Sequence, residues 1–203
     1  MLRKRALLIA VVALLGAALA TVGVLANNDR WATHLAGEFE VPVRDTRAQG
    51  QATFKLSDDG MVLRYKLNVA NIENVFMAHI HAGPATGTGP IVVWLYPSTP
   101  NPQLPQPPDS WLPGRTNGKL AEGEIRAANL VGPLAGKSLA DLVALMNNGG
   151  AYVNVHTNDF QGAANTGPGD FPGGEIRGNL HGDGQGDDDH GNDDHGEHGP
   201  DHK

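Results

Sequence analysis

Val75-Phe-Met-Ala-His-Ile-His-Ala-Gly-Pro84 is the stretch of this 203-residue chain on which its fold and chemistry depend most. Its alternating pattern is typical of a β-strand, in which every second side chain points to the same face. We therefore predict that His79 and His81 project from one face of a strand. The remaining residues divide by the same alternation: Val75 and Met77 with the histidines, and Phe76, Ala78 and Ile80 on the opposite face.

A third histidine lies in a second strand-like run, Ala151-Tyr-Val-Asn-Val-His-Thr157. Here Tyr152, Asn154 and His156 would share one face, and the two valines between them the other. If this strand lies beside or against the strand that carries His79 and His81, three imidazoles can converge. Which strands are neighbours is not encoded in the local pattern, so the convergence is a hypothesis at this point.

Short alternating runs separated by Gly- and Pro-rich turns recur through the chain and predict an all-β fold. We expect an antiparallel β-sandwich with Greek-key-like connections and one short helix. Ser138 is the expected N-cap of this helix, Asp141 occupies its third position, and Gly149-Gly150 ends it. Residues 97–114 hold seven of the 14 prolines and are predicted to form an extended surface insertion. The expected strands cover residues 34–43, 50–56, 61–69, 75–82, 91–96, 119–130 and 151–157.

The two ends of the chain differ from the middle. Residues 1–26 begin with Arg and Lys and continue as an apolar run, which predicts a signal peptide or an N-terminal membrane anchor. The protein is then expected outside the cytoplasm, either secreted or attached to the membrane by that segment alone. Residues 31–181 form the predicted folded domain. Residues 182–203 are rich in Asp, His and Gly and are expected to be disordered.

The distribution of charge excludes several classes of function. The net charge is −7, and residues 182–203 account for all of it with eight acidic residues and one Lys. The 14 basic and 14 acidic residues elsewhere cancel, and no cluster of basic residues is expected in the folded part, so no nucleic-acid partner is expected. Cysteine is absent, which excludes thiolate metal sites and thiol catalysis. The chain also contains neither a serine nucleophile elbow nor a phosphate-binding glycine loop.

Histidines at positions i and i+2 of a strand can give one metal ion two ligands, and imidazole is a common ligand of zinc and copper. His79, His81 and His156 are therefore the candidate ligands of a divalent copper or zinc ion. Glu175, Arg177 and His34 are candidates for a fourth ligand or for supporting the ligands through hydrogen bonds. In the tail, His190, His195, His198 and His202 alternate with aspartates and are expected to chelate metal loosely, or to solvate the chain without any ligand.

The alternative for the three central histidines is a structural network of hydrogen bonds within the sandwich. The strand-borne His-x-His pattern also resembles that of copper-zinc superoxide dismutase, which supplies an enzymatic alternative. That resemblance lacks a second ligand cluster within residues 31–181 and the stabilising disulfide. Likeness of fold does not establish activity, and a non-catalytic protein is expected.

Several segments resemble the chordin-type or CHRD domain, which occurs in the secreted animal protein chordin and in many exported bacterial and archaeal proteins. The resemblance covers roughly residues 31–181 and implies a single exported β-sandwich without a defined activity. It also leaves open an unidentified protein partner, with residues 97–114 as the contact. The similar segments are Leu35-Ala-Gly-Glu-Phe-Glu-Val-Pro42, Ala78-His-Ile-His-Ala-Gly83, Gly89-Pro-Ile-Val-Val93, Leu142–Met146 with Gly150, Tyr152-Val-Asn-Val-His-Thr157 and Pro172-Gly-Gly-Glu-Ile-Arg-Gly178.

Overall fold

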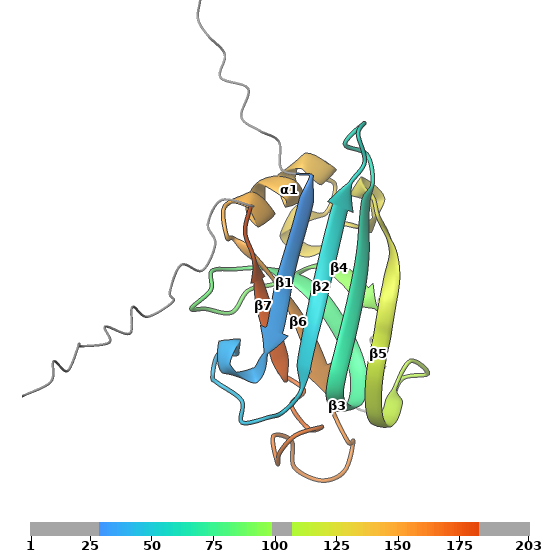
Figure 1. Cartoon of the computed structure of the whole chain (residues 1–203), viewed down its shortest axis with the longest axis vertical. Coiled ribbons are helices and arrows are strands. Elements are labelled where there is room, and N and C mark those ends of the chain that lie inside the picture. Colours follow the sequence, from blue (N-terminus) through green and yellow to red (C-terminus); the bar gives the residue numbers. More distant parts are fainter. Residues whose placement is uncertain (1–28, 99–106, 183–203) are drawn as a thin grey trace, which may run out of the picture.

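The computed structural model describes residues 29–98 and 107–182, which form an antiparallel all-β fold as predicted (Figure 1). One α-helix, α1 (Leu139–Asn147), is present in this part of the chain, together with three short 3-10 turns. The strands in chain order are β1 (Arg30–Ala36), β2 (Gln49–Leu56), β3 (Leu63–Ala82), β4 (Ile91–Tyr96), β5 (Leu112–Ile125), β6 (Ala151–Thr157) and β7 (Ile176–Leu180). The turns are η1 (Gly37–Phe39), η2 (Ala127–Asn129) and η3 (Gly132–Leu134).

Strand β3 is the longest element and runs without a break through the region where the sequence predicts two strands separated at residues 71–74. That prediction is wrong because Asn71 and Asn74 adopt the left-handed conformation, with φ of 55° and 54°. Asparagine tolerates this conformation better than most residues. The pairing with β5 shifts register at both positions, so the polar segment forms bulges inside one strand.

The two halves of β3 have different neighbours, and this closes the sheet. Residues 63–70 pair with β2, whereas residues 75–82 pair with β6. Strand β1 pairs with β2 and, through Ala36 and Arg177, with β7, which in turn pairs with β6. The pairings β1–β2–β3–β6–β7–β1 therefore form a circuit, and the expected layers are joined into one barrel-like sheet. Strands β4 and β5 add to β3 outside this circuit.

The hydrophobic core fills the inside of this sheet. In β1, β2 and the first half of β3, alternate residues such as Trp31, Phe54 and Leu67 point inward and are at most 3% exposed. Helix α1 covers one end of the sheet (Figure 1) and adds Leu142 and Met146 to the same core. Its start is as predicted, because the Asp141 carboxylate accepts hydrogen bonds from the backbone N–H and the hydroxyl of Ser138.

The predicted insertion over residues 97–114 is too long at its C-terminal end. Strand β5 begins at Leu112 and includes Pro113, whereas the sequence predicts a strand only from Lys119 onward. Proline is tolerated because β5 pairs with β3 and lies at an edge of the sheet, where a missing N–H donor costs little. Residues 99–106 of the insertion lie outside the described residues.

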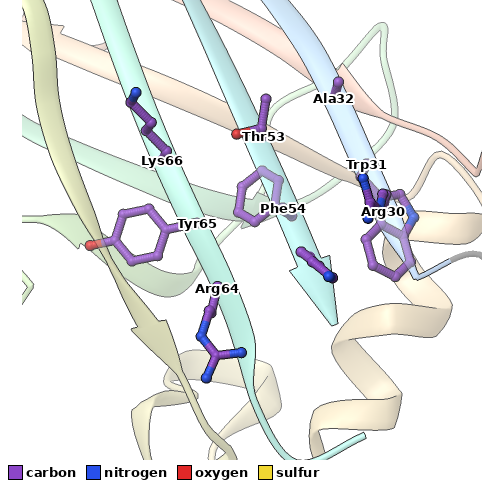
Figure 2. Close-up of a pocket in the computed structure, with 9 residues that line it drawn as sticks. Arg30, Trp31, Ala32, Thr53, Phe54, Arg64, Tyr65 and Lys66 are labelled. Atoms are coloured by element: carbon purple, nitrogen blue, oxygen red, sulfur yellow. The ribbon is translucent and has the colours of Figure 1, made fainter. Parts of the chain in front are cut away.

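The outer side of β1, β2 and β3 collects basic residues that are distant in the sequence. Arg30 lies opposite Lys55, and Lys55 lies opposite Arg64 in the neighbouring strand. Lys66 follows two residues after Arg64 on the same side, and a cavity of about 480 Å³ lies among these strands (Figure 2). We call Arg30, Lys55, Arg64 and Lys66 the basic face. The expectation that cations do not cluster in the folded part is therefore wrong, because strand pairing brings them together.

Among residues 29–98 and 107–182, none of the helices combines the length and the apolar character needed to cross a bilayer. The predicted signal peptide or anchor, residues 1–26, lies outside the described residues. So does the predicted tail beyond Gly182, including His190, His195, His198 and His202.

Candidate metal centre

The three central histidines converge because β3 and β6 are antiparallel neighbours. In this register His79 lies opposite Asn154 and His81 lies opposite Tyr152, which places His156 diagonally from His79 on the same side of the sheet. Within residues 29–98 and 107–182, one ligand-forming nitrogen from each of the three lies within 4.8 Å of the other two. We call His79, His81 and His156 the histidine triad.

The triad lies on the side of β3 and β6 that faces away from the hydrophobic core. Ala78, Ile80 and Val153, which alternate with the triad, belong to the core as the sequence predicts. The predicted alternation fails at Val75, which packs in the core, and at Phe76, whose ring contacts His156 with 6.3 Å between centroids. The cause is a register shift between Val75 and Met77 in the pairing with β6.

Backbone carbonyls set the orientation of two of the three rings. The Nδ1–H of His81 donates to the carbonyl of Gly89 at 2.8 Å, and the Nδ1–H of His156 donates to the carbonyl of Pro172 at 3.0 Å. A neutral imidazole that donates from Nδ1 carries its lone pair on Nε2. The Nε2 atoms of His81 and His156 are therefore the basic atoms that are available at the centre of the triad. This is the arrangement in which protein carbonyls orient metal-binding histidines.

The triad is two donors short as a closed network of hydrogen bonds. Nδ1 of His79 lies 3.1 Å from Nε2 of His156, so a proton on His79 Nδ1 can be donated to His156. The Nε2 atoms of His79 and His81 are buried and have no hydrogen-bond partner among the described residues. A buried nitrogen lone pair without a donor costs free energy, and a cation can take the place of that donor.

Burial keeps all three rings neutral. The relative exposure of the triad is between 0% and 8%. Desolvation, reinforced by the neighbouring rings, lowers the pKa of His79 far below its usual range. Desolvation lowers the pKa of His156 to about 3, and it also lowers the pKa of His81, with the Arg177 charge acting in the same direction. Neutral imidazole is the form that coordinates metal ions, so the rings are ready to bind at neutral pH.

The loop of residues 83–90 contacts the triad at His81 and is held by Arg177. The Arg177 guanidinium donates to the carbonyls of Pro84 and Gly87, both at 2.6 Å, and stacks 3.4 Å above the centre of the Tyr152 ring. The Tyr152 hydroxyl accepts a hydrogen bond from the backbone N–H of Gly89. Residues 83–90 therefore form a cover, whose Gly89 carbonyl also orients His81.

A comparison with known proteins identifies a family for the part of the chain that carries the triad. A family model described as the CHRD domain matches residues 31–164, which is more than half of the chain. The chain belongs to the CHRD domain family. No curated protein and no solved structure matches the chain. The match begins at Trp31 as predicted and includes the whole triad, whereas β7 of this CHRD domain lies beyond it.

The supporting residues that the sequence suggests for the CHRD domain do not all lie at the triad. Both Glu175 carboxylate oxygens are engaged elsewhere, by the hydroxyls of Thr46 and Thr157 and the backbone N–H of Gly169. Glu175 is therefore not a member of the ligand group. It precedes β7, and it holds the loops beside the site together. This corrects the expectation that Glu175 supplies a fourth ligand or a direct hydrogen bond.

The other two supporting candidates, Arg177 and His34, lie in different parts of the structure. Arg177 does lie on the triad side of the sheet, opposite Asn154, but it acts on the cover and not on a histidine nitrogen. His34 is exposed on β1 and makes an edge contact with Phe39, so it is not part of the triad. It lines a separate surface depression together with His181.

Four further residues lie at this site of the CHRD domain, and the sequence offers a signal for only one of them. Tyr152 lies two residues before Asn154 on the predicted face, so the alternation already points to it. Gly89, Trp94 and Glu40 come from three other segments, and Trp94 lies edge-on to His79 with 4.3 Å between ring centroids. Glu40 is buried, and burial raises its pKa to about 7 although the Arg177 and Arg44 charges oppose the shift. No local pattern identifies Glu40.

Proposed function

We propose that this CHRD domain is an exported, non-catalytic metal-binding protein that holds one copper or zinc ion on the histidine triad. The observation that carries the proposal is that one ligand-forming nitrogen from each of the three buried rings lies within 4.8 Å of the other two, while Nε2 of His79 and Nε2 of His81 have no hydrogen-bond partner among the described residues. In protein interiors nearly all buried polar atoms have a hydrogen-bond partner. Two buried nitrogens without such a partner in one triad are therefore expected to bind a ligand.

The spacing of the ring nitrogens supports a first-row transition metal. Nδ1 of His79 and Nε2 of His156 are the two nitrogens that lie 3.1 Å apart, and bonds of about 2.0 to 2.1 Å from one zinc ion to these two atoms would enclose an angle of about 100°. This angle is close to the tetrahedral value that zinc prefers in proteins. Three neutral nitrogen ligands also suit copper, whereas magnesium and calcium prefer oxygen ligands.

The burial of the triad supports binding over catalysis. His79 is fully buried, and the cover of residues 83–90 is tied down by the buried Arg177. A substrate would have to displace this cover before it could reach the ion, whereas a tightly held ion needs no such access. The burial of the triad therefore favours a protein that retains or transfers a metal ion over an enzyme that turns over a substrate. The export segment predicted in residues 1–26 would deliver this function outside the cytoplasm.

The test is the metal content of the chain ending at Gly182, which removes the competing tail histidines. The protein is exposed to copper or zinc, dialysed exhaustively and analysed by elemental mass spectrometry. We expect about one equivalent, retained in His34→Ala and lost in both His79→Ala and His156→Ala. Retention of less than one tenth of an equivalent by the unaltered protein, or equal loss from His34→Ala, would refute the proposal.

A second candidate is a structural hydrogen-bond network inside an extracellular interaction module. The 3.1 Å contact between His79 and His156 favours it, because this contact can be a hydrogen bond without any metal. The same samples distinguish the two functions. A network without metal predicts no retained ion and no change in thermal stability on addition of zinc or copper. A metal centre predicts stabilisation that increases with the concentration of the ion.

A further inference from the structure

The basic face carries like charges in direct register across three strands. Arg30 pairs with Lys55 in the β1–β2 ladder, and Lys55 pairs with Arg64 in the β2–β3 ladder. The alternate residues Trp31, Phe54 and Tyr65 are buried, so the four cationic side chains project outward, and Figure 2 shows those of Arg30, Arg64 and Lys66. Like charges directly opposite each other in a sheet are destabilising, and an anion placed over them relieves the repulsion.

The carboxylates nearby do not balance the charge of Lys55 and Lys66. Glu124 contacts Arg64 at 3.2 Å, but it also bonds Arg126 at 2.8 Å. Glu122, which lies opposite Lys66 in the β3–β5 ladder, forms its salt bridge with Lys119. Within the described part of the chain, Lys55 and Lys66 form no salt bridge. The basic face therefore retains an excess of positive charge, bounded on the β5 side by these two glutamates.

The chain leaves the described structure at the end of the sheet where β1 begins. A side chain added at Gly182 would lie 3.4 Å from Oδ1 of Asn147, and the same oxygen accepts the hydrogen bond of the Trp31 indole at 2.9 Å. Trp31 follows Arg30 in β1. The end of β7 and the start of β1 lie at the same end of the sheet, next to α1 (Figure 1). Lys55 lies at this end of the sheet as well, because it is paired with Arg30.

The segment that follows Gly182 has the complementary charge. Residues 183–203 contain eight acidic residues, with Asp187, Asp188 and Asp189 in succession. Five residues of extended chain reach roughly 17 Å, whereas the three strands of the basic face span about 10 Å. The first acidic cluster can therefore extend over the basic face without any change in the domain.

We propose that the basic face is the docking site of the chain's own acidic segment, residues 183–203. The contact is electrostatic, between aspartate carboxylates and Arg30, Lys55, Arg64 and Lys66. Tethering makes it intramolecular, so the segment is present at a millimolar effective concentration and individually weak ion pairs suffice. Docking neutralises the repulsion across the strands, covers the cavity of about 480 Å³, and excludes other polyanions from this surface. It is independent of the histidine triad.

The chain contains no cysteine, so a spin label attached to one introduced cysteine reports on that position alone. A nitroxide on Gly191→Cys in the full chain, held in neutral detergent micelles, will broaden the amide signals of nearby residues. We expect the signals of β1, β2 and β3 around the basic face to lose at least about half of their intensity at low salt. At 0.5 M NaCl they should recover, because salt screens exposed charges.

Two charge reversals complete the test. Lys55→Glu changes the basic face, whereas Arg47→Glu makes the same change in net charge at the opposite end of the β1–β2 hairpin. The proposal requires that the broadening is lost with Lys55→Glu and kept with Arg47→Glu. Broadening that is absent in the unaltered chain, lies mainly elsewhere on the domain, or responds equally to both reversals would overturn it.

Discussion

His79 and His156 lie 77 positions apart in the chain, yet Nδ1 of the first is 3.1 Å from Nε2 of the second. This contact exists because β6 pairs with the second half of β3. Neither ring can be charged at neutral pH, since burial lowers the pKa of both. The two lone pairs, with that of His81, therefore form a neutral cluster of nitrogen ligands, whose cover and neighbours can be tested separately.

Gly89→Ala is expected to disrupt the cover over the triad. A Cβ at this position would lie 1.7 Å from the carbonyl oxygen of Ala82, so the backbone must move. That movement breaks the bonds that Gly89 makes to His81 and Tyr152. We expect a loss of about 2 to 4 kcal/mol in the free energy of unfolding, measured with urea, and faster metal release. Gly87→Ala is the matched control, because its Cβ meets only the Pro84 ring, at 3.3 Å, and should change stability little.

Arg177→Met is expected to free the cover while keeping most of the apolar contact with Tyr152. The substitution removes both hydrogen bonds to the carbonyls of Pro84 and Gly87. These two partly buried carbonyls then lose a charged donor, which costs about 2 to 3 kcal/mol of folding free energy. Amide hydrogen exchange within residues 83–90 should become faster by at least about tenfold. Arg64→Met, at an exposed ion pair, should leave that exchange unchanged.

Glu40→Gln is expected to change how stability depends on pH. Burial raises the pKa of Glu40 from 4.5 to about 7, so the folded state holds a proton that the unfolded state has already released. The contribution of Glu40 to stability is therefore present below pH 4.5 and falls by up to about 3 kcal/mol as the pH rises through about 7. Urea unfolding between pH 4 and 8 should show this decline in the unaltered protein relative to Glu40→Gln. Parallel curves would contradict the prediction.

His156→Gln is expected to have the opposite effect on the acid side. The folded state keeps His156 neutral because its pKa is lowered to about 3, whereas the unfolded state takes up a proton near pH 6.5. The stability that depends on His156 is thus complete above pH 6.5 and is lost as the pH falls toward 3. The loss amounts to at most about 5 kcal/mol for this residue.

Acid titration of the metal-free protein, followed by circular dichroism, measures this effect. The midpoint of acid unfolding should move to lower pH in His156→Gln when both proteins are compared at equal stability at pH 7. Copper or zinc should also move the midpoint of the unaltered protein to lower pH, because binding requires neutral imidazoles. If His156→Gln unfolds at the same pH as the unaltered protein, the ring is not held neutral in the fold.

The helix and most of the strands could be predicted because their signals are local. Alternation of polar and apolar residues marks β2 and β6, and the interaction of Ser138 with Asp141 marks the start of α1. The same logic fails where the backbone departs from regularity. The left-handed Asn71 and Asn74 look like a break between strands but are bulges within β3.

Local alternation is enough to predict that His79 and His81 lie on one side of a strand and that His156 lies on one side of another, because side-chain direction along a strand follows from backbone geometry. Three further relations depend on the folded chain: the two strands are neighbours, carbonyls of Gly89 and Pro172 orient the rings, and Arg177 holds the cover. These relations join distant segments through closure of the sheet and burial of its faces, which no local pattern specifies. The basic face arises in the same way, from the pairing of three strands.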